Sequence, residues 1–111
     1  MFGFGKTASH REVTPLELQA MLAAGDVALM DVREPNEFAA EHIAGAINAP
    51  LSGFDPGALP VSAGKTVVLQ CAGGKRSSMA LDKCATASAA IDTHLGGGLA
   101  AWKAAGLPTV R

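Results

Sequence analysis

The sequence predicts an α/β fold in which helices cover both faces of a mainly parallel sheet. Short apolar segments alternate along the chain with segments that carry helix signals, as expected of strand–helix–strand units. Residues 67–69 are apolar at every position, without the alternation of a half-exposed strand, so both faces of that strand are expected to be buried. The chain has 111 residues, a length that suits one domain with one core.

The first helix has the clearest start and end signals. Thr14 is expected to cap its N-terminus, with Pro15 in the first turn and Glu17 three residues after the cap. Gly25 is expected to end the helix, because glycine readily adopts the left-handed conformation found at many helix ends. A short edge strand at residues 11–13 precedes this helix.

The remaining elements follow from the same signals in chain order. After the first helix we expect a buried strand at 27–32, a short helix at 35–41 with Phe38 facing inward, and a turn with a short strand at 42–50. The second half is expected to contain a Pro- and Gly-rich connection with one helical turn at 51–64, a strand at 65–70, a helix at 75–90, a strand at 91–95 and a last helix at 99–105.

Composition and charge argue against several kinds of partner. The formal net charge is -1, so no general attraction to nucleic acid or to a membrane surface is expected. No apolar run approaches the roughly 20 residues needed to span a bilayer. The N-terminus does not resemble a signal peptide, and a cytoplasmic protein is expected. Residues 1–10 are predicted to be a flexible tail and residues 11–111 a single domain.

Cys71 is the candidate nucleophile. It follows a predicted strand and precedes Gly73 and Gly74, which permit a tight loop before the helix that begins at Lys75. Loop amides and the helix dipole favour an anion at such a position, so the pKa of the Cys71 thiol should be lowered. Cys84 lies 13 residues further along the chain, mostly along a helix, which is too far for a disulfide. It is expected to be a small core residue.

Charged side chains near this loop allow two interpretations each. Lys75 and Arg76 can attract and orient a dianionic substrate. In the alternative, Lys75 is a solvated loop lysine that only raises the local positive potential, and Arg76 can equally well form a structural ion pair with a carboxylate. Asp31 and Arg33 end a predicted strand, at the edge where open α/β sheets carry their active sites. For these two residues we favour hydrogen bonds that pin loops together, with Arg33 as a substrate contact in the alternative.

The histidines are not expected to bind metal. His10 and His94 are isolated in the sequence, and no Cys/His cluster has the spacing of metal ligands, so no metal site is predicted.

Four motifs along the chain occur together and in a set order. They are Asp31-Val32-Arg33-Glu34 with Glu37 and Phe38, His42-Ile43-Ala44-Gly45-Ala46-Ile47-Asn48, Cys71-Ala72-Gly73-Gly74-Lys75-Arg76-Ser77, and Gly97-Gly98-Leu99 with Ala101-Trp102 and Gly106-Leu107-Pro108. Together they resemble the signatures of a rhodanese domain, from residue 11 to the end of the chain.

The resemblance implies a three-layer fold with a five-stranded, mainly parallel central sheet flanked by helices. It also implies sulfurtransferase chemistry, in which Cys71 carries sulfur as a persulfide and no other cofactor is needed. The donor would be thiosulfate or a related persulfide, and the acceptor a thiol or cyanide; a protein sulfur donor or acceptor also fits. The substrate-binding loop would consist of Ala72, Gly73, Gly74, Lys75, Arg76 and Ser77.

Two alternative functions stay open at this point. Related cysteine phosphatases and arsenate reductases have five residues between the cysteine and the arginine, whereas four residues separate Cys71 from Arg76 here. The smaller loop favours a sulfane sulfur over a tetrahedral phosphate. The other alternative is a non-catalytic or regulatory module that acts as a sulfur relay or a protein-interaction domain. The intact cysteine and basic loop favour catalysis.

Overall fold

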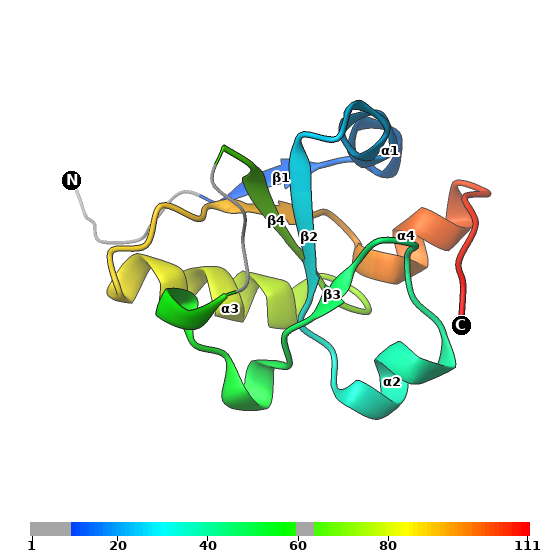
Figure 1. Cartoon of the computed structure of the whole chain (residues 1–111). Coiled ribbons are helices and arrows are strands. Elements are labelled where there is room, and N and C mark those ends of the chain that lie inside the picture. Colours follow the sequence, from blue (N-terminus) through cyan, green and yellow to red (C-terminus); the bar gives the residue numbers. More distant parts are fainter. Residues whose placement is uncertain (1–9, 60–63) are drawn as a thin grey trace.

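The computed structural model describes residues 10–59 and 64–111. Five strands form one sheet in the order β1-β5-β4-β2-β3, and every neighbouring pair of these strands is parallel (Figure 1). They are β1 (Arg11–Val13), β2 (Val27–Asp31), β3 (Ile47–Asn48), β4 (Thr66–Gln70) and β5 (Thr93–Leu95). The predicted α/β fold with a parallel five-stranded sheet is confirmed.

Helices cover both faces of this sheet. α1 (Pro15–Ala24) and α4 (Gly98–Ala104) pack on one face, and α3 (Lys75–Thr86) packs on the other. In Figure 1, α1 lies above the sheet and α3 below it. α2 (Pro35–Ala40) and two 3-10 turns, Leu51–Gly53 and Pro56–Ala58, lie in the connection between β2 and β4.

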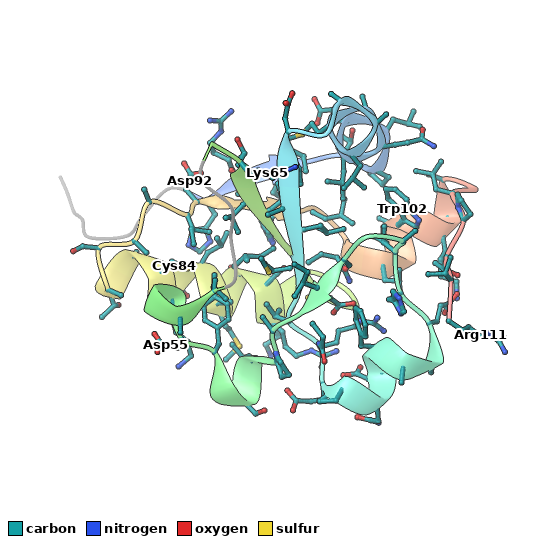
Figure 2. All side chains as sticks on the ribbon, in the orientation of Figure 1. Asp55, Lys65, Cys84, Asp92, Trp102 and Arg111 are labelled. Carbon is teal, nitrogen blue, oxygen red and sulfur yellow. The ribbon has the colours of Figure 1, made fainter. Side chains whose placement is uncertain are left out.

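Two apolar clusters hold the three layers together. Leu18 of α1 belongs to the cluster on one face. Trp102 of α4 belongs to the same cluster, and Cys84 of α3 belongs to the cluster on the other face (Figure 2). The consecutive β4 residues Val68 and Leu69 are both fully buried and fall into opposite clusters. This arrangement explains why the strand is apolar at consecutive positions.

The predicted caps of α1 are confirmed. The Thr14 hydroxyl accepts a hydrogen bond from the Glu17 amide at 3.1 Å, and the Glu17 carboxylate accepts one from the Thr14 amide at 2.8 Å. This capping box satisfies two backbone donors that the helix itself cannot pair. At the other end, Gly25 has a φ of 79° and donates to the Leu22 carbonyl.

The helix predicted at residues 75–90 was too long. α3 ends at Thr86, because Ser88 takes a left-handed conformation with a φ of 57°. The Ser88 amide donates to the Ala85 carbonyl at 3.1 Å, and the Ala89 amide donates to the Cys84 carbonyl at 2.9 Å. These two bonds form a Schellman motif, which usually has glycine where this chain has serine. The missing glycine explains why the sequence did not reveal the helix end.

Other boundaries differ by one or two residues. β5 begins at Thr93 rather than at residue 91, and α4 begins at Gly98 rather than at residue 99. Phe38, predicted to face inward, is half-buried and stacks on the His42 ring with 3.9 Å between ring centroids. Most of the predicted tail at residues 1–10 lies outside the described residues, and the division into a tail and a domain at 11–111 stays a prediction.

The Schellman motif at the end of α3 predicts the effect of two glycine substitutions. Ser88→Gly should stabilise the protein by about 0.5–1 kcal/mol, because relief of the left-handed conformation exceeds the entropic cost of glycine. Ala87→Gly is the matched control, since its φ of -85° suits any residue, and it should destabilise. Urea unfolding of the two variants measures both effects. Equal destabilisation by both would contradict the left-handed conformation at Ser88.

Candidate active site

Cys71 lies at the carboxyl edge of the sheet, directly after the central strand β4. Its side chain is 1% exposed and belongs to the cluster under α3. The chain turns sharply after Cys71 and enters α3 at Lys75. Gly74 makes this turn possible with a φ of 108°, a conformation that residues with a side chain rarely adopt. The short loop therefore leads the backbone around the sulfur atom.

Hydrogen bonds from this loop stabilise negative charge on Cys71. The Gly74 amide donates to Cys71 Sγ at 3.0 Å, and the Ser77 hydroxyl lies 3.5 Å from the same atom. Burial alone would raise the pKa of the Cys71 thiol. The Ser77 hydroxyl and the backbone amides of Ser77, Gly74 and Gly73 outweigh burial, so that the pKa of Cys71 is lowered. The lowered pKa is characteristic of a reactive cysteine.

The first turn of α4 supports the loop from behind. The Leu99 amide donates to the Cys71 carbonyl at 2.8 Å, and the Ala100 amide donates to the Ala72 carbonyl at 3.0 Å. Gly98 lies so close to these carbonyls that a Cβ atom there would be 2.5 Å from the Cys71 oxygen. Only glycine fits at this position, which also has a φ of 59°.

Arg76 forms an ion pair with Glu37 of α2. Its two terminal nitrogens donate to the two Glu37 carboxylate oxygens at 2.7 and 3.0 Å. The hydrogen bond from Arg76, followed by one from the Glu34 amide, lowers the pKa of Glu37 to about 2. The structural ion pair considered for Arg76 is therefore present, and its role as an anion ligand stays a prediction. Lys75, at the start of α3, is exposed.

Asp31 and Arg33 hold α2 against the end of β2. The Arg33 guanidinium donates to both Asp31 carboxylate oxygens, at 2.7 to 3.1 Å, and to the carbonyls of Glu37 and Glu41. Both side chains are almost fully buried. These hydrogen bonds pin loops together, as favoured from the sequence, and substrate contact by Arg33 stays a prediction.

His94 is the residue near Cys71 that sequence analysis missed. It is 4% exposed, and its Nδ1 atom lies 2.8 Å from the Ser77 hydroxyl. Its Nε2 atom lies 3.5 Å from a Glu12 carboxylate oxygen at the edge of the sheet. Its neighbours in β5, Thr93 and Leu95, give no local signal for this contact, which depends on the pairing of β5 with β4. From the sequence, His94 was weighed only as a metal ligand.

Cys84 is a core residue in this structure. It lies on α3 in the same apolar cluster as Cys71, both thiols are free, and burial raises the pKa of Cys84. Within the described ranges, no group of three His, Cys, Asp or Glu side chains is arranged to hold a metal ion. The helices described here include none long and apolar enough to cross a membrane.

Comparison with known proteins places the whole arrangement in context. Residues 14–105 match the family model described as a rhodanese-like domain. An uncharacterized protein of Synechocystis, slr1261, is 46% identical over 105 residues, which cover 95% of this chain and 59% of that protein. A probable adenylyltransferase/sulfurtransferase of Mycobacterium tuberculosis, MoeZ, is 38% identical over 102 residues, which cover 87% of this chain and 26% of that protein.

Solved structures share the fold. A crystal structure of a rhodanese-related protein from Thermoplasma volcanium superposes with a TM-score of 0.77 and 26% identity, over 91% of this chain and 98% of that one. In contrast, the chain spans less than two thirds of the length of the two curated relatives above.

The close approach of Gly98 to the Cys71 loop predicts a large effect of one methyl group. Gly98→Ala should destabilise the protein by about 3 kcal/mol or more, because the new Cβ overlaps two backbone carbonyls and the φ is unfavourable. Gly53→Ala is the control, since nothing lies within 4 Å of its Cβ position. Thermal unfolding measures both. A Gly98→Ala variant as stable as the control would contradict the contact between α4 and the loop.

Proposed function

The chain belongs to the rhodanese-like domain family, and on this basis we propose that it is a sulfurtransferase whose carrier is a persulfide on Cys71. The donor is thiosulfate or a related persulfide, and the acceptor is a thiol or cyanide. One observation carries the proposal: Cys71 Sγ is buried, yet it accepts a backbone hydrogen bond and its pKa is lowered.

The proposed reaction has two steps that both use this stabilised anion. In the first, the Cys71 thiolate attacks the outer sulfur of thiosulfate, the sulfur–sulfur bond of the donor breaks, and sulfite leaves with the bonding electrons. In the second, a thiolate or cyanide attacks the outer sulfur of the persulfide, and Cys71 leaves as a thiolate. The negative charge stays near the loop amides throughout, and preorganised donors of this kind stabilise it without rearrangement.

The loop after Cys71 is the proposed substrate-binding loop. Gly74 is a direct donor to the sulfur, and the amides of its neighbours face the same region. Lys75 adds an exposed positive charge at the N-terminus of α3, where the helix dipole also favours an anion. Arg76 is the proposed anchor for the donor's sulfonate group, in exchange for part of its contact with Glu37.

A sulfur relay between proteins is the second candidate function. The mycobacterial relative that contains a similar region is named as an adenylyltransferase/sulfurtransferase, and this chain matches only 26% of it. A domain of this kind beside another activity favours a protein as sulfur donor or acceptor. A cytoplasmic location fits either candidate, because persulfide chemistry needs a reduced thiol and both cysteines are free.

The first prediction of this proposal concerns sulfur loading. Incubation with thiosulfate and removal of the excess should add one sulfur atom to the protein, because Cys71 takes the sulfane sulfur covalently. Cyanide should remove it. Intact-protein mass spectrometry measures the gain.

Two variants serve as controls for sulfur loading. Cys71→Ser should abolish the gain, whereas Cys84→Ala should retain it, since Cys84 is a buried core residue with a raised pKa. Loading by a protein persulfide but not by thiosulfate would favour the relay. Hydrolysis of a phosphate ester without any sulfur gain would overturn the proposal.

The second prediction separates the two basic residues of the loop. Arg76→Ala should lower kcat/KM for thiosulfate by about tenfold to a hundredfold, because a charge-assisted bond to the sulfonate is worth about 1.5–3 kcal/mol. Lys75→Ala should have a smaller effect, and one that disappears at high ionic strength, because an exposed lysine acts mainly through its long-range charge. Steady-state kinetics with thiosulfate and cyanide measures both. Equal or reversed effects would count against Arg76 as the anchor.

A further inference from the structure

A chain of polar side chains leads from Cys71 to the surface. Cys71 Sγ lies 3.5 Å from the Ser77 hydroxyl, which lies 2.8 Å from Nδ1 of His94. On the far side of the ring, Nε2 lies 3.5 Å from the carboxylate of Glu12, whose side chain is largely exposed. Ser77 and His94 are both buried, so this series of polar side chains passes through the protein rather than through solvent.

We propose that His94 is a positioning residue for Cys71: through the Ser77 hydroxyl it takes up the proton that Cys71 releases, and it keeps that hydroxyl directed at the resulting anion. The inference rests on the proposed function only in treating Cys71 as the sulfur carrier.

The direction of the Ser77 hydroxyl proton depends on which of its neighbours can accept a hydrogen bond. Ser77 has one proton, and three acceptors lie within reach of it: Cys71 Sγ, the Gly74 carbonyl at 3.2 Å and His94 Nδ1 at the shortest distance of the three. When Nδ1 carries no proton, it attracts the Ser77 proton and leaves the sulfur without it. When Nδ1 is protonated, it donates to Ser77, and the hydroxyl proton is free to point at the thiolate.

Ionisation of Cys71 connects the two arrangements. The thiol proton moves to the Ser77 oxygen while the original Ser77 proton moves to His94 Nδ1, so that Ser77 stays a neutral hydroxyl. The products are a Cys71 thiolate and a His94 imidazolium that faces Glu12. Loss of the Nε2 proton toward Glu12 and solvent then leaves a neutral ring with its proton on Nδ1. No electrons are transferred, and each proton has a named donor and acceptor.

The charged groups around His94 favour release of its extra proton toward Glu12 and solvent over a lasting imidazolium. Burial lowers the pKa of His94, and Glu12 on β1 opposes this effect only in part. The ring of His10 lies edge-on to that of His94 with 6.3 Å between centroids, and His10 Nε2 lies 3.1 Å from the Asp82 carboxylate on α3. A positive charge on His10 would disfavour a second one on His94. His94 therefore rests as a neutral ring and passes its proton outward.

Alkylation of Cys71 tests this role without any sulfur donor. The rate of modification by iodoacetamide is measured from pH 5 to 10, with the modified cysteine identified by peptide mass spectrometry. His94→Leu should raise the midpoint of the Cys71 profile by about one pH unit, equivalent to about tenfold less thiolate below both midpoints. Without a donor at position 94, the Ser77 hydroxyl should donate to the nearer Gly74 carbonyl instead of to the sulfur. His94→Asn should stay close to the unmodified protein, because an amide can still donate to Ser77.

The double variant shows whether His94 acts through Ser77. Ser77→Ala should raise the midpoint as His94→Leu does, and combining the two changes should add nothing further. An effect of His94→Leu that persists in full in the Ser77→Ala background would overturn the proposal. So would an unchanged midpoint in His94→Leu.

Cys84 supplies an internal control for folding. Burial raises the pKa of the Cys84 thiol, whereas the pKa of Cys71 is lowered, so rapid alkylation of Cys84 reports loosening of the core under α3. If iodoacetamide modifies Cys84 rapidly in the His94→Leu variant, that variant is loosened. Imidazole ¹⁵N spectra of the unsubstituted protein then decide whether His94 takes up the proton. A proton on Nδ1 that appears at the pH where Cys71 ionises supports the relay, and an Nδ1 that stays unprotonated above that pH overturns it. Failure of thiosulfate loading would leave these readouts intact, so the two proposals fail separately.

Discussion

The packing of α4 against the carbonyls of Cys71 and Ala72 is the constraint on which the site depends. A loop that turns around a buried sulfur atom must point its amides inward, which leaves its carbonyls in need of donors. The free amides of Leu99 and Ala100, in the first turn of α4, are those donors. The lack of a side chain at Gly98 lets the two backbones approach. The N-terminal end of α4 therefore allows the loop after Cys71 to direct its amides at the sulfur.

The two arginines considered as substrate contacts, Arg33 and Arg76, both form ion pairs beside α2. Arg33 is buried against Asp31 and two carbonyls, and Arg76 is held by Glu37 on the neighbouring helix. Removing either partner of a buried pair leaves an uncompensated charge, so a movement of Arg33 away from Asp31 would be costly. Arg76 is a third exposed and can exchange partners at lower cost. The backbone amides, which need no rearrangement, are consequently the stronger source of stabilisation for an anion at Cys71.

Caps and apolar runs within a few residues predicted most of the fold. Contacts between residues distant in the sequence could not be predicted from such local signals. The capping box at Thr14 and the apolar run of β4 are encoded within a few residues, and both were predicted correctly. The end of α3 was not, because Ser88 adopts a conformation that sequence usually signals with glycine. His94 reaches Ser77 only because β5 lies beside β4 in the sheet. The strand order that produces this contact is a property of the whole chain.

Burial of Cys71 and stabilisation of its charge act against each other, and this balance suits the role of sulfur carrier that we propose for Cys71. Burial protects a persulfide from solvent but raises the pKa of the thiol that must attack. The amide of Gly74 and the hydroxyl of Ser77 offset this cost, and they can do so for the thiolate and for a persulfide alike. A site that favoured only one of the two anions would slow one half of a two-step transfer. The adjustable donor that we propose in this set is Ser77, whose hydroxyl lies within hydrogen-bond distance of both Cys71 Sγ and His94 Nδ1. In the transfer that we propose, a rotatable hydroxyl beside a fixed amide would stabilise the sulfur anion in both states.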